Sequence, residues 1–200
     1  MKKGKIIAIS LSCMAVLACC IVLFTNKEAE STDLYSVLGH SVMNDNTVES
    51  SQNIVAYIDG EPFYYDYVQQ SAQARNITDE QLIEYAVKEE LLYREAKANG
   101  ITVSEAELTA YIADLRNAVA NDSDAYNSLL SYCQGANITV DDYWQQTLPV
   151  YEQIMVIARY QDSLHQQFEA QKDTSAAVTF DDYYDQLQDD LMDEYNVVIE

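Results

Sequence analysis

Residues 81–108 read QLIEYAVKEELLYREAKANGITVSEAEL and predict a helix, a tight stop and the beginning of a second helix. Apolar residues recur three or four positions apart, which is the spacing of a helix with one buried face. They are Leu82, Ile83, Ala86, Val87, Leu91, Leu92 and Ala96. Asn99-Gly100 ends this helix, because glycine adopts the left-handed conformation without a Cβ clash. Ser104 and Glu107 form a Ser-x-x-Glu capping box that begins the next helix. No side chains in this stretch form a catalytic arrangement, so we interpret it as scaffold.

A short hairpin precedes this scaffold. Residues 54–63 read IVAYIDGEPF, an apolar strand followed by a turn. Asp59-Gly60 is a strong two-residue hairpin signal, since both central positions of that turn favour positive φ. Pro62 restricts the returning arm to the edge of a sheet. A first helix over about residues 65–74 and the main helix over 79–98 are expected to follow.

Together the two stretches resemble the N-terminal chaperone domain of SurA- and PrsA-type extracytoplasmic folding factors. The family usually opens with a short strand ending in Asn/Asp-Gly-Glu-Pro, and then has a helix, a glycine stop and a capped helix in this order. The resemblance covers about residues 53–172. It implies a helical SurA N-like domain that binds unfolded or secreted polypeptide clients, with no cofactor.

The family often carries an inserted parvulin-type prolyl isomerase module after its long helix. Here only the break at 172–178 occupies that place, so the resemblance implies a chain without isomerase activity. Membership of the family alone keeps a peptidyl-prolyl isomerase as an alternative.

Three further helices are expected between residues 105 and 171. The first presents one apolar face, made of Leu108, Tyr111, Ile112, Leu115 and Val119. Residues 121–124 break it, a short helix spans 125–133, and a long helix runs from about 141 to 171. Pro149 should kink or divide this long helix. Its predicted buried stripe is Leu148, Ile154, Ile157, Leu164 and Phe168.

The C-terminal segment, residues 173–200, predicts a helix over 180–194 and a strand over 196–199. The helix has Tyr184, Leu187 and Leu191 as its apolar face. A two-stranded hairpin alone is marginal in water. The last strand is the one unassigned β-rich segment, so we predict that it pairs with residues 54–58. The expected fold is therefore mostly α, with a small β-sheet that pairs the first and last strands.

The N-terminal residues indicate a membrane segment. Residues 1–5 form a basic tip, and the uncharged run at 6–24 is long enough to span about 28 Å as a helix. The lysines place the tip in the cytoplasm and the remainder of the chain outside. An uncleaved transmembrane anchor is favoured over a lipoprotein processed at Cys19 and over a cleaved signal peptide. Residues 25–52 are polar and predict a flexible linker.

The charge of the chain excludes some functions. The net charge is −22, and three of the 11 bases, Lys2, Lys3 and Lys5, lie in the basic tip before the apolar run. A surface this acidic repels phosphates, so a nucleic-acid partner is not expected. No nucleophile–base pair and no metal-ligand spacing is visible, so we predict neither a catalytic nor a metal site. The isolated Cys133 is expected to be a small buried apolar residue.

Aromatic residues are the remaining candidates for binding, because the chain has 16 tyrosines and one tryptophan. Tyrosine and tryptophan give large amphipathic contact areas and suit the binding of varied peptides. Seven lie on the middle helices: Tyr111, Tyr126, Tyr132, Tyr143, Trp144, Tyr151 and Tyr160. They are either ordinary core residues or the lining of a client-binding groove.

The function that the resemblance implies is a membrane-tethered extracytoplasmic chaperone without enzymatic activity. Besides the prolyl isomerase, an envelope adaptor that binds one folded partner through its acidic surface remains an alternative.

Overall fold

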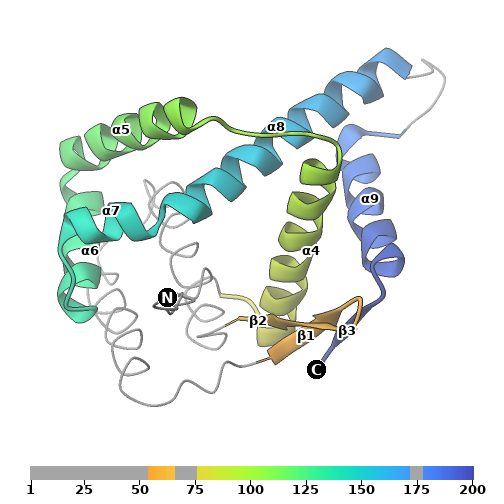
Figure 1. Ribbon diagram of the computed structural model, residues 1–200, viewed down its shortest axis with the longest axis horizontal. Coiled ribbons are helices and arrows are strands. Elements are labelled where there is room, and N and C mark those ends of the chain that lie inside the picture. Colours follow the sequence, from red (N-terminus) through yellow and green to blue (C-terminus); the bar gives the residue numbers. More distant parts are fainter. Residues whose placement is uncertain (1–53, 66–75, 172–177) are drawn as a thin grey trace, which may run out of the picture.

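The computed structural model describes residues 54–65, 76–171 and 178–200. These ranges are mostly helical and include a three-stranded antiparallel sheet (Figure 1). The predicted membrane segment, the linker, the helix expected after Tyr65 and most of the break at 172–178 lie outside the described residues. Within the described ranges, no helix combines the length and the apolar character needed to cross a membrane.

The hairpin forms as the sequence predicts. Strand β1, Ile54–Ile58, pairs antiparallel with β2, Glu61–Tyr64. Asp59 has φ 54° and Gly60 has φ 80°, the positive values that this tight turn requires. β2 lies at one edge of the sheet, where the missing N–H of Pro62 is tolerated.

The last strand closes the sheet, which confirms the predicted pairing of the two ends of this domain. β3, Val197–Ile199, lies antiparallel to β1 on the side opposite β2, so the strand order is β2-β1-β3. Tyr57 pairs with Val198 in this register. The Glu200 N–H also donates to the Val55 carbonyl at 3.1 Å, just beyond the ladder.

Helices α4, Asp79–Ala98, and α5, Glu105–Asn121, begin and end where the sequence predicts. Thr78 caps α4 in a capping box with Gln81, and the Ser104–Glu107 box caps α5. Gly100 has φ 77°, which allows the chain to leave α4 in a left-handed conformation.

The predicted short helix needed correction at its boundaries, whereas the predicted division of the long helix is confirmed. Helix α6 is Ser123–Gly135 and is longer than the predicted 125–133. The Asp122 carboxylate accepts hydrogen bonds from the N–H groups of Asp124 and Ala125, both at 3.0 Å, so the helix begins two residues earlier. The long helix is divided, as Pro149 allowed, into α7, Val140–Gln146, and α8, Leu148–Gln171.

Helix α9, Phe180–Glu194, begins with a Thr179–Asp182 capping box, and its range confirms the prediction. It lies beside α4 (Figure 1), and Lys88 of α4 forms an ion pair with Asp189 of α9 at 2.8 Å. The same lysine pairs with Glu84 within α4 at 2.8 Å.

The main buried residues form two cores, which we name the aromatic core and the sheet core. The aromatic core comprises Ile112, Val119, Leu129, Tyr132, Cys133, Ala136, Tyr143, Trp144 and Tyr151. The sheet core comprises Ala56, Ile58, Val87, Leu91, Leu92, Ala96, Val156, Tyr160, Leu164 and Leu191. Helix α8 contributes to both cores and runs from α7 to the end of the molecule that holds α9 (Figure 1).

The predicted buried stripe of α8 is confirmed in part, since Leu148 and Ile154 pack half-buried against the aromatic core and Ile157 packs half-buried against the sheet core. Of its five residues, only Leu164 is fully buried. The buried residues of α8 are Val150, Tyr151, Val156, Tyr160 and Leu164. The prediction assumed one continuous face, whereas Tyr151 lies in the aromatic core and Val156, Tyr160 and Leu164 lie in the sheet core.

Candidate functional site

Five of the seven predicted binding aromatics form one network of ring contacts. Tyr111 and Tyr151 have ring centroids 6.0 Å apart, and Tyr151 stacks on Trp144 at 6.1 Å. Tyr143 has edge contacts with Trp144 at 5.2 Å and with Tyr132 at 5.8 Å. Edge-to-face and offset arrangements at these distances are favourable for aromatic pairs. The sequence therefore identified residues that do meet in space.

The network lies mostly inside the protein. Tyr132, Tyr143, Trp144 and Tyr151 are each at most 2% exposed, as the ordinary-core interpretation expects. Tyr111 is half-buried at the edge of the network. The rings of the buried four are occupied by one another, so they offer no open groove to a client in this conformation.

The other two predicted residues lie apart from the network. Tyr160 is buried in the sheet core. Tyr126, on α6, is 40% exposed and is the member of the seven with a clearly accessible ring.

Burial also sets the ionisation of the aromatic core. Removal from water raises the pKa of Tyr143 well above its ordinary value, and the neighbouring Tyr151 adds to this effect. Burial raises the pKa of the Cys133 thiol to about 11, with a smaller contribution from the Asp142 charge. Both groups are neutral at physiological pH, and Cys133 is buried, as the sequence predicted.

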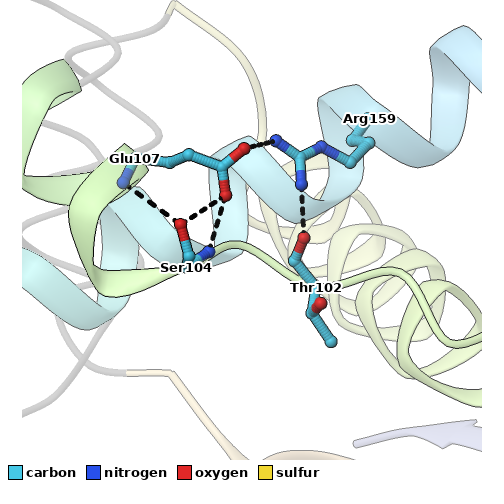
Figure 2. Close-up of polar contacts among 4 residues, drawn as sticks. All are labelled: Thr102, Ser104, Glu107 and Arg159. Atoms are coloured by element: carbon cyan, nitrogen blue, oxygen red, sulfur yellow. Dashed lines mark hydrogen bonds and ion pairs between the residues drawn. The ribbon is translucent and has the colours of Figure 1, made fainter.

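A polar cluster connects the α4–α5 link to α8 (Figure 2). Arg159 of α8 donates one hydrogen bond to the Thr102 carbonyl and another to a Glu107 carboxylate oxygen, the latter at 2.7 Å. The other oxygen of Glu107 accepts from the Ser104 hydroxyl at 2.7 Å and from the Ser104 N–H at 2.8 Å. One carboxylate therefore serves as helix cap and as partner of a distant arginine.

These contacts shift the ionisation of Glu107. The hydrogen bonds from Ser104, followed by the contact with Arg159, lower its pKa from 4.5 to about 2. Because both carboxylate oxygens of Glu107 already accept hydrogen bonds within the cluster, we interpret it as a structural tie.

Two further observations concern His165 and the side-chain types that commonly ligate metals. The His165 ring lies 4.6 Å from the Phe180 ring in an edge contact, on the exposed side of α8. Among the residues that the structure describes, no group of three or more His, Cys, Asp or Glu side chains is placed to hold a metal ion.

The sheet carries an exposed apolar face that the sequence did not predict. Val55, Ala56 and Ile58 of β1 are buried, because a bulge between Ile54 and Ala56 turns two successive residues inward. Directly paired residues of neighbouring strands point to the same face of a sheet. The outward residues, which we name the outer sheet face, are Ile54, Tyr57, Pro62, Tyr64 and Val198.

These residues are accessible. Ile54 is 38% exposed, Tyr64 is 42% exposed and Val198 is 52% exposed, while Tyr57 is half-buried. The strands are too short for their alternation to be read from sequence, and the bulge hides which residues face outward. In the sequence, this face could have been predicted from β1, because its residues are apolar on both sides of the strand.

Comparisons with known proteins leave the family open: the chain matches no protein-family model, and it matches no curated protein and no solved structure.

Proposed function

We propose that this chain is a membrane-tethered, extracytoplasmic chaperone-like protein that binds unfolded or partly folded segments of secreted proteins. The observation that carries the proposal is the order of two motifs in one chain. The hairpin sequence IVAYIDGEPF precedes a helix–glycine–helix run with a Ser104–Glu107 capping box, the arrangement in which SurA- and PrsA-type folding factors begin.

The proposed membrane topology rests on the sequence of the first 52 residues. Basic residues 1–5 would remain in the cytoplasm, 6–24 would anchor the chain, and 25–52 would hold the domain at some distance from the membrane. Such a tether suits a protein that meets polypeptides as they leave the membrane.

Two features of the chain support peptide binding over catalysis. The outer sheet face provides exposed apolar side chains, against which an extended peptide can bury its own apolar residues. The acidic balance of 33 acids against 11 bases keeps a client-loaded protein in solution through charge repulsion. The proposal assigns the chain no reaction and no cofactor.

Aggregation of several unrelated, chemically unfolded proteins tests the proposal. The full chain in mild detergent should reduce light scattering of each client when present in equal amounts, whereas an acidic globular protein of similar net charge should not. Unchanged scattering for all clients would refute the chaperone function. Capture of a single folded partner with no effect on unfolded clients would favour the adaptor, and prolyl turnover by the full chain would favour the isomerase.

A further inference from the structure

The two edges of the sheet are not equivalent. Edge strands present unpaired N–H and C=O groups, and proteins often block them with proline or charged residues. β2 has both, since Glu61 and Pro62 lie on it. β3 is the other edge in the part of the chain that the structure describes, and its sequence Val197-Val198-Ile199 has neither.

The register shows which groups of β3 face outward. The Glu200 N–H bonds to the Val55 carbonyl, and hydrogen-bonded pairs alternate along an antiparallel ladder. Val198 therefore directs its N–H and C=O toward Tyr57 of β1. Val197 and Ile199 direct theirs away from the sheet, toward the open edge.

The side chains beside this edge are apolar and the flanking charges are negative. Val198 and Ile199 are 52% and 40% exposed. Residues 178–200 contain eight acids and no base. Three of these acids, Asp193, Glu194 and Glu200, are exposed directly before and after β3.

We propose that the β3 edge is the client-binding site, and that it takes an extended polypeptide segment in which apolar residues alternate with basic ones. This inference rests on the proposed chaperone function and names its substrate class. The client backbone would pair with Val197 and Ile199 as a fourth strand. Its apolar side chains would extend the outer sheet face, and its basic side chains would lie near the acids that flank β3.

Charge decides between a client and a second copy of the chain. Two copies paired through β3 would bring together the acidic ends of two chains that each carry a net charge of −22. A basic, extended segment is instead attracted by the negative charge around β3, so it is the better occupant of the edge.

Fluorescence anisotropy with labelled synthetic peptides tests the inference on the full chain in mild detergent. The probe alternates valine with lysine, and two matched peptides replace lysine with glutamate or carry N-methyl groups on alternate backbone amides. Both changes should weaken binding roughly tenfold, because one removes charge attraction and the other removes backbone hydrogen bonds.

Variants locate the site. Ile199→Pro removes an outward N–H while leaving the β1 pairing of Val198, and should weaken binding of the lysine peptide roughly tenfold. Ile199→Val keeps the N–H and should bind like the parent chain.

Val198→Lys changes only an exposed side chain and should also weaken binding, which covers the case in which the proline variant does not fold. Tyr126→Ser changes the accessible ring of α6 and should have no effect.

The outcomes separate the inference from the function. If the chain suppresses aggregation but Ile199→Pro and Val198→Lys bind the peptide as well as the parent, the edge is not the site and the function stands. If Tyr126→Ser alone weakens binding, clients bind near α6 and the inference is wrong.

A second copy would be the occupant of the edge if the chain forms concentration-dependent dimers, Ile199→Pro abolishes them and the peptide does not displace them. Absence of both peptide binding and aggregation suppression would refute function and inference together.

Discussion

The aromatic core and the sheet core differ in where the chain supplies their residues. The buried residues of the aromatic core all fall between Ile112 and Tyr151, on four consecutive helices. Those of the sheet core come from β1, α4, α8 and α9, from Ala56 to Leu191. Contacts that are close in sequence form with little loop-closure cost, whereas the sheet core requires both ends of the described chain.

The two regions also differ in what they leave exposed. The aromatic core uses its large rings internally, and four of the predicted binding residues are almost completely buried there. Within the described residues, the sheet buries one side of β1 and partly exposes the other, and its edge strand β3 contains neither proline nor a charged residue. The comparison indicates that the aromatic network belongs to the interior of the protein, and the sheet is the surface that we propose for binding.

The largest expected effect is on the aromatic core. Trp144→Ala should lower the free energy of unfolding by about 3–5 kcal/mol, because it removes a fully buried ring that contacts two tyrosines. Chemical denaturation of the full chain, followed by circular dichroism, measures this change. Tyr126→Ala on the exposed side of α6 is the control and should change stability by less than about 0.5 kcal/mol. A similar loss in both variants would mean that burial in this core is not what stabilises it.

The next effect concerns closure of the sheet core. Deletion of residues 195–200 removes the half-buried side chains of Tyr195 and Val197 and the hydrogen bonds between β3 and β1. Because Val198 and Ile199 are largely exposed, the expected cost is about 2–3 kcal/mol. The denaturation midpoint should fall relative to the full chain. An unchanged midpoint would show that the tail does not close the sheet core.

A smaller effect concerns the tie between α8 and the α4–α5 link. The folded-state pKa of Glu107, about 2, lies below its unfolded value of 4.5. Its contribution to stability is therefore complete above pH 4.5 and is lost as the pH falls through 2. Glu107→Gln should make the loss of stability between pH 4.5 and 2 shallower than in the parent chain.

The control for this tie is Glu105→Gln, which removes an acid from the same first turn but keeps the Arg159 contacts. It should retain the parental slope over this pH range. Arg159→Lys should reduce stability by less than about 1 kcal/mol at neutral pH, since the pair is exposed. Equal slopes in the parent and Glu107→Gln chains would exclude Glu107 as a source of the acid sensitivity.

Much of the fold could be predicted because it depends on local signals. Caps at Thr78, Ser104 and Thr179 set the beginnings of three helices, and Gly60 and Gly100 set two turns. The pairing of β1 with β3 was also predicted, because a short hairpin requires a third strand and one β-rich segment remained.

What the sequence could not predict depends on the direction in which side chains point. The face of α8 changes partners along its length, so a single periodic stripe missed Val150 and Val156. The bulge in β1 determines which residues form the outer sheet face, and its position has no sequence marker. Five of the seven aromatic residues that the sequence grouped do meet in space, but composition alone does not distinguish a packed core from a groove.

Amide hydrogen exchange of the full chain, with and without the valine–lysine peptide, tests most directly the claim that clients bind at the sheet. In the free chain the Val198 N–H, which points to β1, should exchange more slowly than those of Val197 and Ile199. Adding the peptide should slow exchange at Val197 and Ile199 and leave the helices of the aromatic core unchanged. Slower exchange in residues 132–151 with no change in β3 would contradict the account.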